Sequence, residues 1–219
     1  MSIAENNKRI AKNTLALYFR TFITMIVGLY TGRVMLQALG VENYGINAVV
    51  GGIVGMSSLI TGTMSAAISR YITYALGKKE DGQLKSMLST SINAQIVMAM
   101  IVALVLEIAG VWFLNNEANI PEGRMEAANW VLQCSIVTLM ISLISSPFNA
   151  LIIAHERMAI YAYMSVVDVT LKLAICFVIM AYGGDRLVLL VVLQVVVALS
   201  MSIFYGWYCG RNFEDAHYS

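Results

Sequence analysis

The sequence predicts an all-α integral membrane protein built as a six-helix transmembrane bundle. Hydrophobic residues make up 59% of the 219 residues and charged residues only 12%, about half the charged share of a soluble domain. Six apolar runs are long enough to span a hydrocarbon core about 30 Å thick. They are uniform and lack the short alternating pattern of a membrane barrel, so each is expected to be a helix. The six runs cover residues 14–37, 44–76, 87–114, 127–154, 159–182 and 187–209.

The chain divides into one transmembrane lobe and two polar ends. We expect an N-terminal segment at 1–13, the lobe at 14–209, and a short tail or the start of an interlobe linker at 210–219. Basic residues set the orientation, because connections on one side hold eight Lys and Arg and those on the other hold two, which places both termini in the cytoplasm. The eight are Lys8, Arg9, Lys12, Lys78, Lys79, Lys85, Arg157 and Arg211, and the two are Arg124 and Arg186.

Two opposite charges lie near the middle of the fifth run. Asp168 and Lys172 are four residues apart, so on a helix they share a face and can touch. Asp168 lies about 13 Å along the helix from Ala159, close to the midplane of the membrane. Each charge alone would cost about 3 kcal/mol at that depth, so we treat the pair as a candidate functional site. A satisfied ion pair that fixes the helix register is the structural alternative.

Four other charged residues lie inside the runs. Arg20 belongs to a polar stripe on the first run and either snorkels to the cytoplasmic surface or lines a cavity. Arg70 lies near the cytoplasmic end of the second run, and Arg33 lies near an outer end, as an interfacial anchor would. Glu107 is either a snorkelling carboxylate or a proton-coupling one. The resulting excess of intramembrane cations suits an anionic substrate.

Small and polar residues recur at helical spacing in two runs. In the second run they favour close packing against a neighbouring helix; they are Gly51, Gly55, Ser58, Gly62, Ser65 and Ser69. The fourth run repeats the pattern with Ser135, Thr138, Ser142, Ser145 and Asn149. Pro147 interrupts the fourth run and is expected to kink it. The kink suits either a moving helix beside a wet cavity or a fixed packing shape.

Chemistry of other kinds has no motif in this chain. The zinc-protease, nucleophile-elbow and Walker motifs do not occur, so we expect neither an enzyme nor a cofactor. His155 and His217 are too far apart for a metal cluster. No basic soluble face exists for nucleic acid.

Several stretches resemble one family of membrane proteins. They are NTLALYFRTFITMIVGLYTGRVMLQALG at 13–40, VENYG at 41–45, AISRY at 67–71 leading to GKK at 77–79, and PFN to AHERM at 147–158 continuing to LKL at 171–173. These stretches are similar to Wzx-type polysaccharide flippases of the multidrug/oligosaccharidyl-lipid/polysaccharide (MOP) exporter superfamily. The resemblance covers nearly the whole chain.

The resemblance implies one lobe of a MATE-like transporter, in which two six-helix lobes flank a central cavity and work by alternating access. The substrate would be an undecaprenyl-pyrophosphate-linked oligosaccharide repeat, flipped across the bacterial inner (plasma) membrane for O-antigen and lipopolysaccharide biosynthesis. The family's cationic cavity positions would map onto Arg20, Arg33, Arg70 and Lys172. A second six-helix lobe, from a homodimer or a missing C-terminal half, is the expected partner.

Three alternatives stay open. A cation-coupled multidrug antiporter would use Asp168 and Glu107 as coupling acids. A non-transporting subunit would be half of a two-lobe assembly. A membrane-embedded glycosyltransferase would want acidic residues in a sizeable outer loop, which the segment 115–126 hardly supplies.

Overall fold

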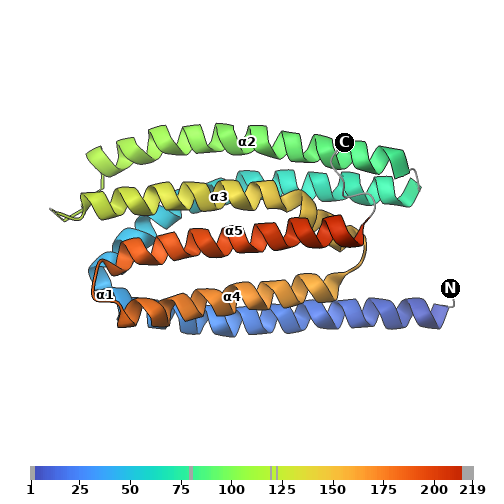
Figure 1. Ribbon diagram of the computed structural model, residues 1–219, viewed down its shortest axis with the longest axis horizontal. Helices are drawn as coiled ribbons and strands as arrows, with labels where there is room; N and C mark the ends of the chain where they lie inside the picture. Colours follow the sequence, from blue (N-terminus) through green and yellow to red (C-terminus); the bar gives the residue numbers. More distant parts are fainter. Residues whose placement is uncertain (1–2, 79–80, 119, 122, 214–219) are drawn as a thin grey trace.

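The computed structural model is a bundle of long helices that run along one common direction (Figure 1). It describes residues 3–78, 81–118, 120–121 and 123–213, and the side chains at 3–9, 58–61, 64–65, 76, 78 and 81–85 are not described. The helices are α1 (Ile3–Lys78), α2 (Asp81–Asn116), α3 (Met125–Ala154), α4 (Met158–Ala181) and α5 (Arg186–Asn212). Each contains a stretch that is long and apolar enough to cross a membrane. The predicted all-α membrane bundle is confirmed.

Helix α1 contains the first two predicted spans. Its backbone is helical except at Gly40, where φ is 77° and ψ is 167°. Positive φ favours glycine, which has no Cβ to clash with the backbone. The chain reverses direction there, so that the two halves of α1 run in opposite directions (Figure 1). Six predicted spans therefore correspond to five labelled helices.

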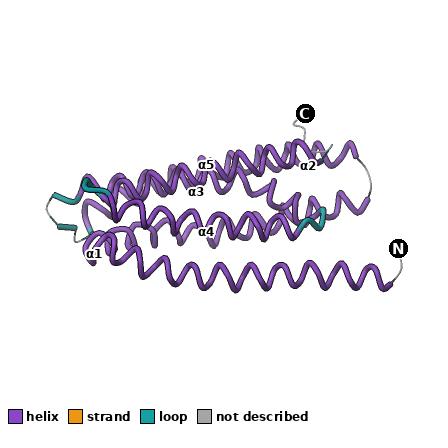
Figure 2. The backbone as a smooth tube through the Cα atoms, turned by 60° about the horizontal axis from the view of Figure 1, so that its bottom comes forward, coloured by secondary structure: helices purple, strands orange, loops and turns teal. Residues whose placement is uncertain are grey.

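Helix α3 lies at the centre of the packing. It contacts α1, α2 and α5, while α4 packs mainly against α1. In the second view, the N-terminal half of α1 lies along one side of the bundle beside α4 (Figure 2). Fully buried apolar side chains from several helices meet between them, among them Val50, Ile72, Leu132 and Leu190. These side chains meet because helical spacing places the apolar residues of each helix on one face, which packs against its neighbours.

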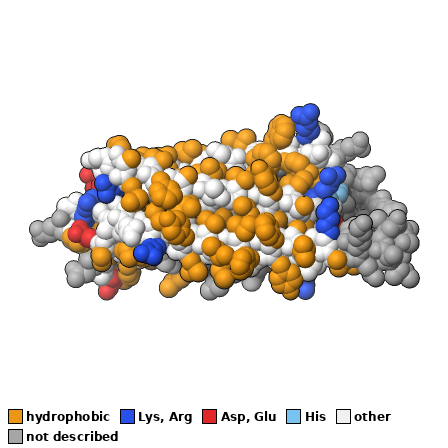
Figure 3. All heavy atoms as spheres, turned by 90° about the horizontal axis from the view of Figure 1, so that it is seen from below, with side chains coloured by type: hydrophobic (Ala, Val, Ile, Leu, Met, Phe, Trp, Pro, Cys, Tyr) orange, Lys and Arg blue, Asp and Glu red, His pale blue; other side chains and the backbone are white. Residues whose placement is uncertain are grey.

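The outer surface is apolar between two charged ends. A broad belt of hydrophobic side chains covers the middle of the face in Figure 3, and Lys, Arg, Asp and Glu gather toward the ends. Large exposed side chains such as Leu29, Met100, Leu104 and Ile203 contribute to this surface. A water-soluble protein would not expose such an area, and a membrane-embedded one needs it.

Ionic contacts hold the bundle together at the end near Gly40, which we call the Gly40 end. Arg124, just before α3, donates from Nη1 to Oδ2 of Asp185 at 2.8 Å, and its Nε lies 4.0 Å from Oε1 of Glu42. Asp185 also caps α5 by accepting from the backbone N–H of Leu187 at 3.0 Å. Three charged side chains thus join the bend in α1 to the starts of α3 and α5.

Arg186 provides a second connection at the Gly40 end. Its Nη1 donates to the carbonyl of Ala38 at 3.0 Å, and its Nε donates to the carbonyl of Tyr182 at 3.2 Å. Ala38 lies two residues before Gly40, where the reversal interrupts the helical hydrogen bonds. The Arg186 guanidinium therefore donates hydrogen bonds to carbonyls both at the bend in α1 and at the end of α4.

The two small-residue stripes have different surroundings. A Cβ added at Gly51, Gly55 or Gly62 would meet no atom within 4 Å, so the predicted close packing is not met within the described chain. The reason is that α1 packs through the neighbouring stripe that includes Val50 and Ile72, whose branched side chains bury more apolar area. The stripe on α3, in contrast, faces the interior, as the next section describes.

The ends of the chain differ from the simplest expectation. Helix α1 already begins at Ile3, so most of the predicted segment 1–13 continues the first span as helix. Residues 1–2, and the predicted tail from 214 onward, lie outside the described residues.

Pro147 is expected to kink the fourth run. Helix α3 stays helical through Pro147 and turns toward α4 near its C-terminal end (Figure 1).

Candidate functional site

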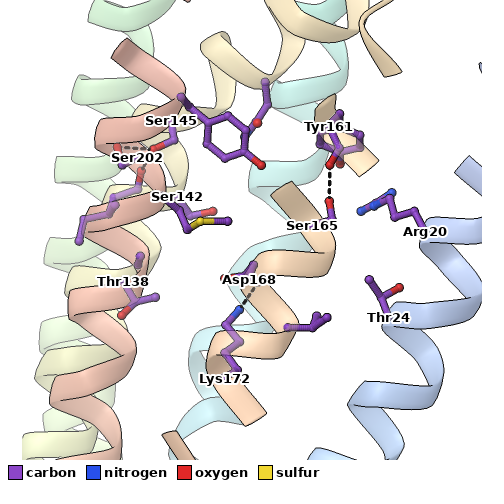
Figure 4. A pocket seen from close by; sticks show the side chains of 16 residues that line it. Arg20, Thr24, Thr138, Ser142, Ser145, Tyr161, Ser165, Asp168, Lys172 and Ser202 are labelled. Carbon is purple, nitrogen blue, oxygen red and sulfur yellow. Dashed lines mark hydrogen bonds and ion pairs between the residues drawn. The ribbon is translucent and has the colours of Figure 1, made fainter. Parts of the chain in front are cut away.

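A polar cavity of about 370 Å³ lies inside the bundle between α1, α3, α4 and α5. Its lining combines three charged side chains with hydroxyl groups and an amide, and we call it the charged cavity. The polar residues that line it are Arg20, Thr24, Thr138, Ser142, Ser145, Asn149, Tyr161, Ser165, Asp168, Lys172, Ser202 and Tyr205. Figure 4 shows these side chains around the opening. Such a site is unusual because charged side chains are rare within membrane-spanning helices.

The predicted contact between Asp168 and Lys172 is confirmed. Lys172 Nζ donates to Asp168 Oδ2 at 2.7 Å, and the two side chains are 46% and 29% exposed for Lys172 and Asp168. Both residues lie on α4 and line the charged cavity (Figure 4). The pair is therefore partly exposed, and both charged side chains border the cavity.

Arg20 comes from the first half of α1 and points at α4 (Figure 4). Its guanidinium carbon lies 4.5 Å above the centre of the Tyr161 ring. A cation over an aromatic face is stabilised by about 0.5–2 kcal/mol, depending on desolvation. Its Nε is buried and has no hydrogen-bond partner among the described residues. Of the two interpretations of Arg20, the geometry matches the one in which it lines a cavity.

Charges in the cavity do not cancel. Arg20 and Lys172 contribute two positive charges and Asp168 contributes one negative charge, which leaves an excess of one positive charge among the lining residues. A charge at membrane depth is unfavourable without a partner. The cavity is thus electrostatically suited to an anion.

Hydroxyl groups form the rest of the polar wall. Ser145 donates to the Ile141 carbonyl at 2.7 Å and lies 2.6 Å from the Ser202 hydroxyl. Ser165 donates to the Tyr161 carbonyl at 2.9 Å. Hydroxyls that donate to their own helix keep lone pairs free to accept. Hydrogen-bond capacity toward a polar ligand therefore surrounds the charged residues.

Three other predicted charges lie away from this cavity. Arg33 and Arg70 are exposed and do not line it. Glu107 accepts from the Gln133 side-chain amide on both carboxylate oxygens, at 2.7 and 2.8 Å, on the exposed side of α2 and α3. The structure thus separates Glu107 from Asp168. Pro147 is buried in α3, between the lining residues Ser145 and Asn149.

Helix α5 supplies residues that the sequence did not single out. Ala198, Met201, Ser202 and Tyr205 line the cavity, and their spacing of three or four residues is that of one helix face. Most of the neighbouring positions are apolar, so this face has no clear polar signature in the sequence. Its role becomes visible only once α5 is placed against α3.

The fold and the cavity define a class: a multi-pass α-helical membrane protein with a polar, positively biased cavity inside an apolar bundle. A family model described as "Polysaccharide biosynthesis protein" matches residues 10–218. The chain belongs to this family, which is that of the Wzx-type polysaccharide flippases of the MOP superfamily. No curated protein and no solved structure matches the chain. Family membership indicates a flippase-type transporter of polysaccharide biosynthesis rather than an enzyme.

Proposed function

We propose that the chain is the N-terminal lobe of a flippase for undecaprenyl-pyrophosphate-linked oligosaccharides. It would move the repeat unit from the cytoplasmic to the periplasmic leaflet of the bacterial inner membrane. The observation that carries the proposal is the charged cavity, whose lining holds the two cations Arg20 and Lys172 and a single carboxylate, that of Asp168. A pyrophosphate would offset the positive excess through charge-assisted hydrogen bonds.

Asp168 has a defined part in this mechanism. Without substrate it accepts a hydrogen bond from Lys172 at 2.7 Å and offsets its charge. An entering pyrophosphate competes for the same ammonium group. Arg20, whose guanidinium carbon lies 4.5 Å from the centre of the Tyr161 ring, offers a second, pre-oriented contact. Binding therefore replaces the Asp168–Lys172 ion pair with one between Lys172 and the pyrophosphate. While the cavity is empty, the Asp168–Lys172 pair keeps the free-energy cost of the charged side chains low.

The lipid tail and the sugars need different surroundings. Sugars and pyrophosphate cannot cross about 30 Å of hydrocarbon unaided, and a hydroxyl-lined cavity replaces water around them. The polyprenyl tail can remain in lipid beside the apolar belt. Such a division explains why a polar cavity lies inside a bundle whose outer face is apolar.

Alternating access requires two bodies that move against each other. We infer that a second six-helix lobe is the partner, either a second copy of this chain or a separate lobe. Native mass spectrometry in lipid nanodiscs distinguishes a homodimer from a monomer or a heterodimer. The eight-to-two distribution of basic residues supports an orientation with both termini in the cytoplasm.

Loss of Lys172 tests the proposal. In a deletion strain complemented with the full gene, Lys172→Ala should abolish surface polysaccharide while the protein still accumulates in the membrane. Lys12→Ala serves as the matched control, because Lys12 is exposed and does not line the cavity. Wild-type export by Lys172→Ala would refute the role of Lys172.

A cation-coupled multidrug antiporter is the second candidate. The observation in its favour is that Asp168 provides a carboxylate within the charged cavity, where a sodium ion or proton could bind it. Drug export that depends on a cation gradient and is lost in Asp168→Asn would support this candidate. Polysaccharide export that is insensitive to the gradient would exclude it.

A further inference from the structure

A groove of about 450 Å³ lies at the Gly40 end and shares no lining residue with the charged cavity. It is formed by the start of α3, the end of α4 and the start of α5, which lie together at this end of the bundle (Figure 1). Trp130 and Tyr182 supply two aromatic rings, and Glu126 and Asp185 supply two carboxylates. The other side chains of the lining are apolar. We call this site the aromatic groove.

The position of the aromatic groove matches the boundary between lipid headgroups and lipid chains. Trp130 lies five residues past the start of α3, and Val192 lies six residues past the start of α5. At 1.5 Å per residue, the groove extends about 9 Å from the helix ends. Trp and Tyr side chains are enriched at this depth. Because Trp130, Tyr182 and Val192 are exposed, the groove opens on the surface that lipid covers.

The two carboxylates of the groove differ in their partners. Asp185 Oδ2 accepts from Arg124 at 2.8 Å, and Asp185 Oδ1 accepts from the backbone N–H of Leu187 at 3.0 Å. Glu126 is exposed and makes no hydrogen bond or ion pair with the described residues. No Lys or Arg is among the described residues that line the groove. Glu126 is therefore the carboxylate that can accept from a cationic ligand.

Packing holds the ring of Tyr182 in position. A Cβ at Gly184 would lie 2.6 Å from Cε1 of Tyr182, so the ring occupies the space that a side chain at 184 would need. The backbone carbonyl of Tyr182 also accepts from Arg186 Nε at 3.2 Å. A cation over an aromatic face is stabilised by the charge distribution of the ring. The aromatic wall is thus formed before a ligand arrives.

A phospholipid with an ammonium headgroup matches these features. Its positive charge complements the carboxylate of Glu126, and its chains can lie against the apolar side chains of α5, such as Val188 and Val192. A primary ammonium has three N–H donors, whereas a quaternary ammonium has none. The open carboxylate favours the primary ammonium, because a charge-assisted hydrogen bond then adds to the attraction between opposite charges.

We propose that the aromatic groove binds a phospholipid whose headgroup carries a primary ammonium, as in phosphatidylethanolamine, with Glu126 accepting hydrogen bonds from that group. The headgroup phosphate would lie toward Arg124, whose guanidinium has five N–H donors and already contacts Asp185. The bound lipid would join the start of α3 to the start of α5, which Arg124 and Asp185 already link. This site is separate from the charged cavity and does not depend on what that cavity binds.

Native mass spectrometry of the full chain, purified in detergent and mixed with lipids, tests the proposal. The mixture holds equal amounts of phosphatidylethanolamine, phosphatidylcholine and phosphatidylglycerol with the same acyl chains. Differences in retention then report the headgroup alone. We call the ratio of bound phosphatidylethanolamine to each other lipid the ammonium preference. We expect a preference of roughly fivefold over both, as one net hydrogen bond to a charged group provides.

Three variants separate recognition by the groove from general lipid binding. Glu126→Gln should abolish the ammonium preference, because the amide has no charge to attract the ammonium. Glu117→Gln is the matched control and should keep the preference, since Glu117 is also an exposed carboxylate of the Gly40 end but lies outside the groove. Gly184→Ala keeps Glu126 but displaces the Tyr182 ring, so it should reduce the preference by a smaller factor than Glu126→Gln does.

Several outcomes would overturn the proposal. Equal retention of the three lipids by the wild type would show that the protein binds acyl chains without reading the headgroup. Equal retention of phosphatidylethanolamine and phosphatidylcholine would exclude the assigned hydrogen bond, because phosphatidylcholine has no N–H donor. An unchanged preference in Glu126→Gln, or an equal loss in Glu117→Gln, would place the recognition outside the groove.

Discussion

Replacing Asp168 by asparagine should strengthen the binding of an anionic lipid to the cavity. Asp168 accepts a hydrogen bond from Lys172 at 2.7 Å, so substrate must compete with it for the ammonium group. Asparagine has nearly the same shape and no charge. The variant therefore removes the competitor and raises the positive excess of the lining from one to two charges.

The magnitude follows from the geometry. Two unit charges 4 Å apart interact by about 4 kcal/mol near a protein surface and about 1 kcal/mol in water. Because the Lys172 and Asp168 side chains are 46% and 29% exposed, we discount the larger value to about 1–2 kcal/mol. This corresponds to roughly a five- to thirtyfold lower Kd for a prenyl pyrophosphate.

Titration of nanodisc-embedded protein with a prenyl pyrophosphate measures the change. Glu107→Gln is the matched control, because it also neutralises an intramembrane carboxylate but lies outside the charged cavity, beside Gln133. We expect no change in Kd for that variant. Unchanged or weaker binding in Asp168→Asn would show that Asp168 and the anion do not compete for Lys172.

Three further predictions concern Arg20 and the Gly40 end. Tyr161→Leu removes the ring beneath Arg20 and should weaken prenyl pyrophosphate binding several-fold, whereas Tyr161→Phe should not, because the ring remains. Arg186→Gln removes the donor to the Ala38 carbonyl and should lower stability by about 1–3 kcal/mol, seen as a lower unfolding midpoint in detergent; an unchanged midpoint would contradict the structural role. Gly40→Ala should cost about 1–3 kcal/mol in the same assay, because φ of 77° with ψ of 167° is a conformation that essentially only glycine adopts, and a stabilised variant would contradict the strain argument.

Local spacing predicts several features of the site correctly. Asp168 and Lys172 touch because residues four apart are neighbours on any helix. The polar stripe on the fourth run lines the cavity through Thr138, Ser142 and Asn149. Such features depend on one helix alone, and helical periodicity is sufficient to find them.

Features that depend on two helices are harder to predict. The glycines near Gly55 favour close packing by their spacing, but the adjacent apolar stripe at Val50 and Ile72 packs instead. Likewise, the sequence allows the Arg20 side chain either to reach the cytoplasmic surface or to line a cavity. The packing of α1 beside α4, which brings Arg20 over Tyr161, selects the cavity. Tyr205 belongs to the site only because α5 packs against α3. In each case tertiary packing selects among faces that the sequence leaves open.

The reversal at Gly40 lies between these two cases. A glycine between two apolar runs predicts a break in the helix, and the backbone does adopt positive φ there. Helical geometry nevertheless resumes at once on both sides. The contacts of Arg186 with Ala38, and of Arg124 with Glu42, explain how so tight a reversal is held. Neither contact follows from sequence spacing, since the partners are far apart in the chain.

The affinity of purified protein for a bare prenyl pyrophosphate, measured for the wild type and for Lys172→Gln, tests the central claim most directly. Lys12→Gln is the control, since it removes the same charge from an exposed site outside the cavity. The charged cavity predicts binding at least tenfold weaker in Lys172→Gln and unchanged in Lys12→Gln. Equal affinity in all three proteins would mean that this cavity does not hold the anionic group.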